Sequence, residues 1–308
     1  MKSISATEFL LLDGLRTDYI IPNMLPEVGR IALYGVAKKG KSFLALQLAF
    51  AVCQGIPFLG HEVAKPGPVL YLQFDTPPEL WQDRLKKLQA AGVSIPDNLY
   101  VLHPSTQPRR ANLLDGAQSH AIHDMLMARL PALVIVDVLA SIHHLKENEA
   151  DDMKQVIGRL NTLFQGRAYM IVHHTAKPNM APGAGRPSPS AAGRGSSYLG
   201  GEMDANWLLT STGKKQGRLA IEARFAGPTD DVDMIQNDLG LWVKATQELL
   251  APRLMEAIKF INDHTDLAYA ECERLAVEAG VKEITFKRAW RTLNAGLHGA
   301  ELQGPAAT

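Results

Sequence analysis

The feature of this sequence that most constrains its fold is the stretch from Gly35 to Ser42, GVAKKGKS. It fits the spacing G-x-x-x-x-G-K-[ST], in which glycines bound a tight loop and a lysine and a hydroxyl residue close it. Residues 30–34 are mostly apolar and predict a strand, and the apolar run 43–50 predicts a helix. Because a strand, this loop and a helix form a phosphate-binding unit, we expect a nucleoside triphosphate to bind here.

The chemistry of this loop comes from its backbone and from two side chains. Successive N–H groups line an anion-binding hollow, and the amino end of the following helix adds partial positive charge. We expect Lys41 to reach the β- and γ-phosphates of ATP and Ser42 to hold Mg²⁺. The loop interior lacks glycine, so Lys38 and Lys39 either add phosphate contacts or are solvated. The predicted ATP-binding residues are Gly35, Val36, Ala37, Lys38, Lys39, Gly40, Lys41, Ser42 and Phe43.

The pattern along residues 30 to 225 predicts an α/β fold. Apolar segments of strand length occur at 69–74, 99–102, 133–136 and 169–172, and helical segments lie near 77–91, 117–129 and 151–165. Because the strands show little polar alternation, we expect a mainly parallel central sheet with helices on both faces. Later strands near 208–209 and 217–226 are predicted to be antiparallel.

We divide the chain into three parts. Residues 1–28 form an N-terminal extension and a candidate subunit contact, and residues 29–245 form the α/β domain. Residues 246–308 are predicted to form a small helix–turn–helix or winged-helix-like module with a frayed tail. Basic and acidic residues are mixed in this module, so contact with DNA and contact with a protein both remain open.

Composition and charge narrow the classes of protein further. The 308 residues are 46% hydrophobic and 21% charged, which suffices for one large or two ordinary packed domains. The formal net charge is zero, so nucleic-acid binding requires a local basic patch. No apolar run is long enough to span a bilayer, and Cys53 and Cys272 form no disulfide framework. We therefore expect a cytoplasmic protein without a membrane partner.

Polar residues at the carboxyl ends of the predicted strands supply the rest of a catalytic site. Asp137 ends an apolar strand, where its carboxylate either binds Mg²⁺ beside the loop or simply terminates the strand. Asp75 ends the strand 69–74 and either orients the attacking water or caps the next helix. His174 follows the strand 169–172 and is either a hydrogen-bonding sensor of the γ-phosphate or a packed core histidine.

Two further features point beyond a single nucleotide site. Arg224 lies in a late strand and is either an arginine finger for a neighbouring subunit or a surface residue. The segment 177–201 is rich in Pro, Gly, Ser and Ala and carries Lys177, Arg186 and Arg194. We expect this loop to be mobile or ordered by a ligand, with its basic residues contacting single-stranded DNA; the alternative is a disordered surface loop.

The motifs together resemble the RecA-like P-loop ATPases, specifically the RepA-type hexameric replicative helicases of plasmids and phages and their AAA-domain relatives. The resemblance covers most of residues 8–228. Its matching residues are Asp18-Tyr19, Pro22-Asn23-Met24, the loop 35–42, Leu70-Tyr71-Leu72, Pro77-Pro78, Asp137, Val156-Ile157-Gly158-Arg159, His173-His174, Lys177 and Arg194-Gly195-Ser196-Ser197.

The resemblance implies a hexameric ring in which His174 senses the γ-phosphate and the loop 177–194 faces a central channel for single-stranded DNA. Two positions depart from the family pattern. The family usually has a catalytic Glu where this chain has Asp75, which is shorter by one methylene and implies slower hydrolysis or adjusted geometry. Related helicases also carry a Lys two residues before the finger arginine, where this chain has Glu222.

Together these observations predict an ATP-hydrolysing, ring-forming motor on single-stranded DNA that takes part in replication or recombination. Its predicted catalytic residues are Lys41, Asp75, His174 and Arg224, with Ser42 and Asp137 at the metal. A slow, nucleotide-switched adaptor that binds or loads DNA remains open. A small-molecule P-loop kinase remains a weaker alternative, since no arginine-rich lid is present in the sequence.

Overall fold

The structure is a computed structural model of the chain. It describes residues 3–12, 18–102, 111–175, 188–193, 198–227 and 229–245, and then 260, 261, 263, 264, 267, 269–283, 285–287 and 290. The chain divides into two compact units, Met1–Lys244 and Ala245–Thr308.

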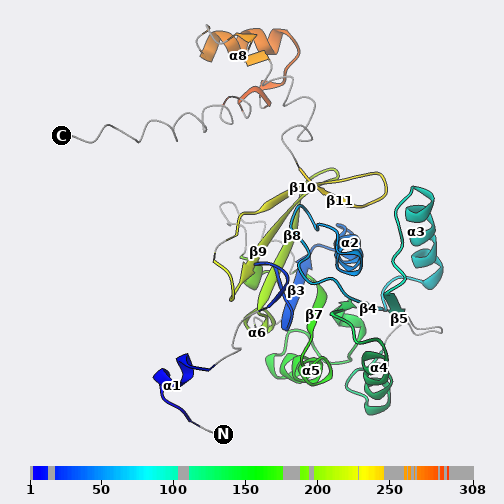
Figure 1. Cartoon of the computed structure of the whole chain (residues 1–308). Coiled ribbons are helices and arrows are strands. Elements are labelled where there is room, and N and C mark those ends of the chain that lie inside the picture. Colours follow the sequence, from blue (N-terminus) through cyan, green and yellow to red (C-terminus); the bar gives the residue numbers. More distant parts are fainter. Residues whose placement is uncertain are drawn as a thin grey trace. The chain divides into compact units, whose positions relative to one another are not determined.

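A nine-stranded sheet forms the centre of the first unit in its described part, with the order β11-β10-β9-β8-β3-β7-β6-β4-β5 (Figure 1). The strands are β3 (Gly29–Gly35), β4 (Val69–Gln73), β5 (Leu99–Leu102), β6 (Leu133–Asp137), β7 (Ala168–His174), β8 (Ala205–Gly213), β9 (Gln216–Ala223), β10 (Val232–Gln236) and β11 (Trp242–Lys244). Pairs among β3 to β8 are parallel, whereas β8–β9, β9–β10 and β10–β11 are antiparallel.

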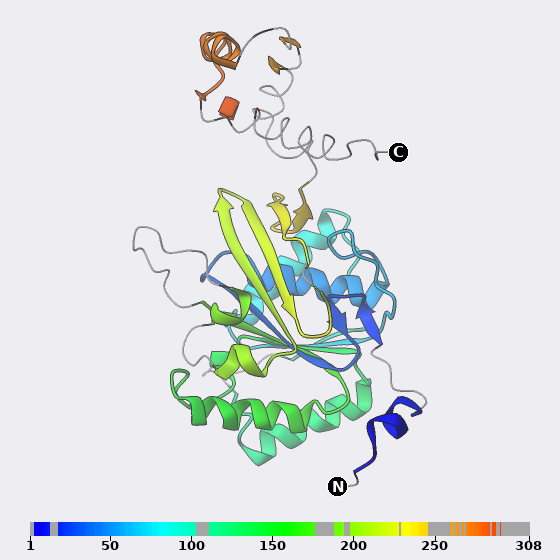
Figure 2. The same cartoon turned by 90° about the vertical axis from the view of Figure 1, so that its left-hand side faces the viewer.

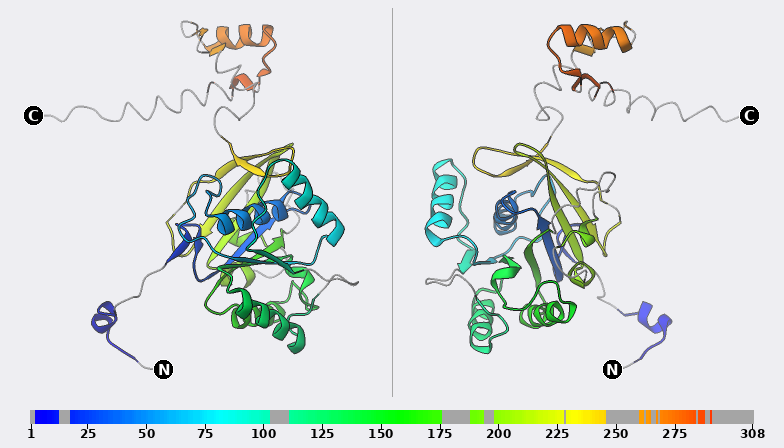
Figure 3. Two further views of the ribbon diagram at one scale, coloured as in Figure 1. Left: turned by 45° about the vertical axis from the view of Figure 1, so that its right-hand side comes forward. Right: turned by 180° about the vertical axis from the view of Figure 1, so that it is seen from behind.

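Helices cover both faces of this sheet, as Figures 2 and 3 show. The apolar cluster on one face includes α2 (Lys41–Gln54) and α3 (Pro78–Ala90). The cluster on the other face includes α4 (Gly116–Arg129) and α5 (Ala150–Leu163). In α5 the buried residues Met153, Val156, Ile157 and Leu160 follow the i, i+3, i+4, i+7 spacing of a helix with one apolar face. The mainly parallel α/β fold predicted from the sequence is therefore confirmed.

The remaining described elements are short. They are α1 (Ala6–Leu10), β1 (Tyr19–Ile21), β2 (Leu25–Pro26), the 3₁₀ turns η1 (Leu139–Ser141) and η2 (Pro189–Ala191), α6 (Tyr198–Glu202) and α8 (Tyr269–Glu278). Within the described ranges, no helix is both long and apolar enough to cross a membrane.

Two features of the sheet differ from the sequence prediction. The strand β8 is parallel to β3 and antiparallel only to β9, so it extends the parallel part of the sheet by one strand. The edge strands β10 and β11 were not predicted, because β10 has only five residues, two of them polar, and β11 has three. In such short strands of mixed polarity the alternation of apolar and polar residues is too brief to recognise. They become strands because they pair with a neighbouring strand.

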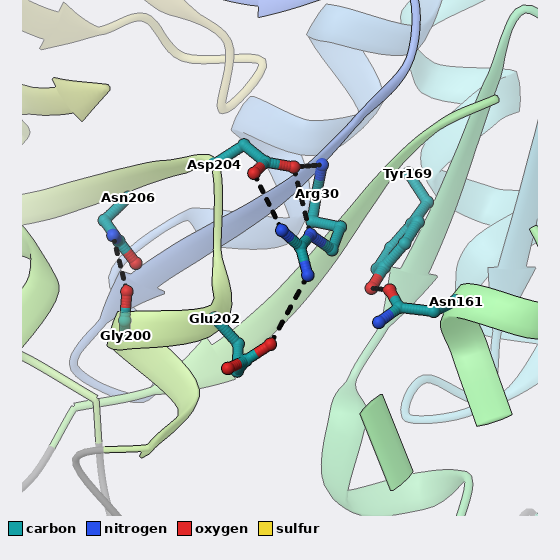
Figure 4. Close-up of polar contacts among 7 residues, drawn as sticks. All are labelled: Arg30, Asn161, Tyr169, Gly200, Glu202, Asp204 and Asn206. Carbon is teal, nitrogen blue, oxygen red and sulfur yellow. Dashed lines mark hydrogen bonds and ion pairs between the residues drawn. The ribbon is translucent and has the colours of Figure 1, made fainter. Parts of the chain in front are cut away.

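The amino end of β3 is fixed to the start of β8 by a charged cluster (Figure 4). The backbone N and the Nε of Arg30 both donate to Oδ2 of Asp204, at 2.9 and 3.0 Å, and Nη2 donates to Oδ1 at 2.9 Å. Nη1 of Arg30 also donates to Glu202 at 3.4 Å. Because Asp204 directly precedes β8, this two-pronged pairing aligns the parallel strands β3 and β8.

The second unit has its own small apolar cluster of Ile261, Cys272, Ala276 and Phe286. Its described helix α8 is followed by Gly280 at φ +91°, a conformation that suits glycine at a turn after a helix. Cys53 and Cys272 are both free thiols. The winged-helix-like character of this unit remains a prediction.

Candidate functional site

The loop after β3 positions the lysine of the phosphate-binding motif. Lys41 is the first residue of α2, and only 5% of it is exposed. Its Nζ donates to the carbonyl oxygens of Gly35 at 2.7 Å and Val36 at 3.1 Å. The same Nζ lies 3.3 Å from Nδ1 of His174. The ammonium is therefore held over the loop, at the amino end of the helix, where an anion is stabilised by N–H groups and helix dipole together.

The surroundings of Lys41 lower the pKa of its ammonium group. Burial lowers the pKa of Lys41 to about 8, although the charges of Asp137 and Asp75 act in the opposite direction. A bound phosphate would add negative charge beside the ammonium and raise this pKa again, which favours the protonated form. The protonated form of Lys41 is therefore stabilised most by a polyanionic ligand.

The hydroxyl of Ser42 and the carboxylate of Asp137 lie side by side. Ser42 Oγ donates to Asp137 Oδ1 at 3.2 Å, and Tyr71 OH donates to Asp137 Oδ2 at 2.7 Å. Asp137 is 1% exposed, and burial raises its pKa, while the hydrogen bonds from Tyr71 and Ser42 oppose that rise. A hydroxyl and a carboxylate beside a phosphate-binding loop are hard oxygen donors, so this pair fits Mg²⁺.

The two adjacent histidines lie on opposite faces of the sheet. His174 is half-buried beside Lys41, and burial together with the charges of Lys41 and His173 lowers its pKa, which leaves a neutral ring that accepts from the ammonium. His173 is buried on the other face, with its ring against Tyr34 and its Nδ1 3.7 Å from Glu147 Oε1. Only His174 therefore faces the phosphate-binding loop.

Asp75 joins this group, whereas Arg224 does not. Asp75 is exposed just beyond the carboxyl end of β4, and its charge acts on Lys41, Asp137 and His174. Arg224 is exposed just beyond β9, and its backbone N donates to Asp204 O at 2.9 Å. Asp204 marks the amino ends of the parallel strands, so Arg224 lies at the sheet edge opposite to the loop of its own chain.

The predicted DNA-contacting residues Lys177, Arg186 and Arg194 lie outside the described residues. The described segments on either side of 176–187 meet in an isolated bridge between Thr175 and Gly193. The side chain of Glu222, which stands where related helicases carry a lysine, accepts from Ser190 N at 3.2 Å and from Ser190 Oγ at 2.9 Å. Glu222 therefore connects β9 to the turn η2.

Sequence reasoning assigned no role in the site to several residues that build it. Tyr71 supports Asp137, and the Arg84 guanidinium lies 4.2 Å above the centre of the Phe43 ring. Trp242 Nε1 donates to the carbonyl of Gly40. The tyrosine hydroxyl in the middle of a mostly apolar strand is a signal that could have been noticed, because a buried hydroxyl requires a partner. The other contacts depend on side chains whose neighbours are distant in the sequence.

The site is identified from side-chain chemistry and not from the size of a cavity. A cavity of about 780 Å³ lies at the amino ends of the strands, lined in part by Ile20, Lys65, Leu130 and Arg167. None of the predicted nucleotide-binding residues lines it. The motif residues are instead gathered at the carboxyl edge, where ligands bind in open parallel sheets.

The strand order and the loop define the RecA-like fold of P-loop ATPases. A family profile described as "AAA domain" matches residues 15–180, and the chain belongs to this family. The structure is similar to the solved "ATPase Domain of G40P", with a TM-score of 0.53 and 14% identity over 71% of this chain and 86% of that chain. It is also similar to a DnaB-like replicative helicase solved with its primase interactions, with a TM-score of 0.52 and 13% identity over 71% of this chain and 57% of that chain. The RecA-like, AAA-domain family predicted from the sequence motifs is thereby confirmed.

Proposed function

We propose that this protein is an ATP-hydrolysing motor of the RepA type that assembles into a ring, most simply a hexamer, and moves along single-stranded DNA. The observation that carries the proposal is the meeting of Lys41, His174, Ser42 and Asp137 at one sheet edge in a member of the AAA domain family. The similarity in fold to a replicative helicase supports DNA replication as the setting. We place this activity in the cytoplasm.

Each residue of the site has a defined task in this proposal. Lys41 binds the β- and γ-phosphates of ATP, and its proton is retained by their negative charge. Ser42 and Asp137 would hold Mg²⁺, which would supply neutralisation of phosphate charge. Asp75 orients the attacking water, and His174 contacts the γ-phosphate. Because His174 also contacts Lys41, loss of the γ-phosphate changes the hydrogen bonding at the end of β7.

In this proposal a neighbouring subunit contributes an arginine to each nucleotide site. Arg224 lies at the opposite edge of the sheet from its own loop, and this position supports a role at the nucleotide of a neighbouring subunit. There it stabilises charge on the transferring phosphoryl group. Lys177, Arg186 and Arg194 contact the phosphates of single-stranded DNA. Movement at the end of β7, which leads directly to Lys177, links hydrolysis to DNA.

ATP turnover by the full chain, with and without single-stranded DNA, tests the proposal. We expect Lys41→Ala and Arg224→Ala each to lower turnover at least about a hundredfold, since each removes transition-state charge stabilisation. Lys41→Ala should also lose nucleotide binding, whereas Arg224→Ala should retain it. Lys214→Ala, in the exposed turn between β8 and β9, serves as the matched control.

Three outcomes would contradict parts of the proposal. Full turnover in Lys41→Ala would overturn the nucleotide site. A monomer by native mass measurement with a non-hydrolysable ATP analogue would overturn the shared role of Arg224. Turnover that DNA does not stimulate, combined with ATP-dependent retention of DNA, would replace the motor by a nucleotide-switched adaptor.

A further inference from the structure

The hairpin of β10 and β11 at the sheet edge makes direct contact with the phosphate-binding loop. Trp242, the first residue of β11, is 3% exposed, and its indole Nε1 donates to the carbonyl oxygen of Gly40 at 3.2 Å. That carbonyl also accepts the first bond of α2, from Leu44 N at 3.0 Å. Two donors thus fix the orientation of the Gly40 peptide, which stands between the loop and the helix.

The indole fits a slot that two glycines leave open. A Cβ atom on Gly40 would lie 2.9 Å from the indole of Trp242, and one on Gly217 of β9 would lie 2.8 Å from it. Gly40 also has φ +89°, in the left-handed region that favours glycine. The ring is therefore closely packed between the loop and the sheet, and it cannot be replaced by a larger or differently shaped group without a shift.

A second set of contacts fastens the same hairpin to α2. The side-chain amide of Gln47 donates to Trp242 O at 2.7 Å and accepts from Trp242 N at 2.8 Å. The hairpin turn packs on Phe43, the residue that follows the phosphate-binding motif, since a Cβ on Gly240 would lie 2.6 Å from the Phe43 ring. The Gln236 amide closes the turn by donating to Gly240 O at 2.7 Å. The hairpin is thus attached to the loop and to the first two turns of its helix.

The loop itself gives a reason for such support. Its interior contains no glycine, and Lys38 has φ +61°, which is unfavourable for a residue with a Cβ atom. The N–H groups that bind phosphate are effective only when they point at the ligand before it arrives. An outside contact that holds the Gly40 peptide supplies this preorganisation.

We propose that Trp242 is a positioning residue for nucleotide binding, through which the β10–β11 hairpin holds the phosphate-binding loop in its binding conformation. The inference rests on the proposed function only in that the loop binds a nucleoside triphosphate. Trp242 touches no phosphate; it acts through Gly40. Its indole also lies close enough to the loop for its fluorescence to respond when nucleotide binds.

The test compares nucleotide affinity and turnover in the full chain carrying Trp242→Phe or Gln47→Met. Trp242→Phe keeps a ring and removes the donor to Gly40, and Gln47→Met keeps the indole and removes both bonds that fasten β11. We expect each to raise the Kd and KM for ATP about three- to tenfold, as for loss of one neutral hydrogen bond, with kcat at saturation within about twofold. Val243→Ala, at an exposed position of the same strand, is the control.

The split between KM and kcat separates positioning from a merely structural role, and fluorescence reports whether nucleotide binding changes the surroundings of the indole. Wild type and Trp242→Phe share Trp81, Trp207 and Trp290, so a change in emission on adding ATP that disappears in the variant belongs to Trp242. Circular dichroism identifies any variant that fails to fold, and the other variant then decides. A Kd equal to that of Val243→Ala, or a loss confined to kcat, would overturn the positioning role while leaving the nucleotide site intact. A wild-type chain that binds no ATP would overturn both.

Discussion

Replacing Tyr71 by phenylalanine removes one atom, the hydroxyl that donates to Asp137 Oδ2 at 2.7 Å. Both residues are essentially inaccessible to solvent, with 0% of Tyr71 and 1% of Asp137 exposed. Water therefore does not replace the lost donor without rearrangement. A hydrogen bond to a charged acceptor contributes about 1.5–3 kcal/mol, against about 0.5–1.5 kcal/mol for a neutral pair. We expect Tyr71→Phe to lower the free energy of unfolding by the larger amount when Asp137 is ionised.

The pH dependence follows from the direction of the pKa shift. Burial raises the pKa of Asp137 above its ordinary value despite the bonds from Tyr71 and Ser42, so the folded chain binds this proton more tightly than the unfolded chain does. Stability from this group therefore falls as pH rises through the interval between the two pKa values. Removing the Tyr71 donor raises the folded pKa further. The deficit of the variant should thus grow as pH rises above the ordinary pKa of an aspartate.

Tyr169→Phe is the matched control for this experiment. Tyr169 is also a buried strand tyrosine, but its OH donates to the neutral amide oxygen of Asn161 at 2.8 Å (Figure 4). We expect Tyr169→Phe to lower the free energy of unfolding by about 0.5–1.5 kcal/mol, independent of pH in this range. The assay is urea unfolding followed by tryptophan fluorescence at several pH values. Equal losses in the two variants at pH 8, or a Tyr71→Phe deficit that does not change with pH, would refute the reasoning.

Two further predictions concern packing and proton linkage. Gly200→Ala should lower the free energy of unfolding by about 1–3 kcal/mol or more, because the new Cβ atom would lie 1.8 Å from Ser190 O. In the control Gly201→Ala, in the same helix, the new Cβ atom meets nothing within 4 Å, so the midpoint of urea unfolding should hardly change. Affinity for ATP should weaken as pH rises through about 8, the pKa of Lys41, approaching about tenfold per pH unit as the ammonium loses its proton. Titration with a fluorescent ATP analogue from pH 6.5 to 9.5 checks this, and a flat profile would contradict it.

The parts of the fold that the sequence predicted well are those with a strong local signal. The five residues of β6, LVIVD, are all buried, and β4 is likewise buried throughout, so their nearly continuous apolar pattern identifies strands covered on both faces. The helix α5 repeats its buried residues with helical spacing. A strand of this kind is covered by helices on both faces, and the helix is covered on one face. The polarity of consecutive residues therefore repeats the same pattern along the whole segment, which makes the segment recognisable from its sequence.

The edge of the sheet could not be predicted in this way. The strands β10 and β11 are short and mixed in polarity, and β8 pairs in parallel with β3 although it is antiparallel to its neighbour in sequence, β9. Backbone pairing defines such strands, and the partner of a strand is not written in its own residues.

The candidate site divides along the same line. The sequence alone determined a phosphate-binding loop with Lys41 and Ser42 and a buried strand that ends in Asp137. These residues lie in short motifs, and the motif of the loop has a specific chemistry. Only the tertiary structure decided which groups hold them in place. Tyr71 reaches Asp137 across 66 positions of the chain, and Trp242 reaches Gly40 across 202. A hydrogen bond between residues so far apart depends on how strands are ordered in the sheet, which no local pattern encodes.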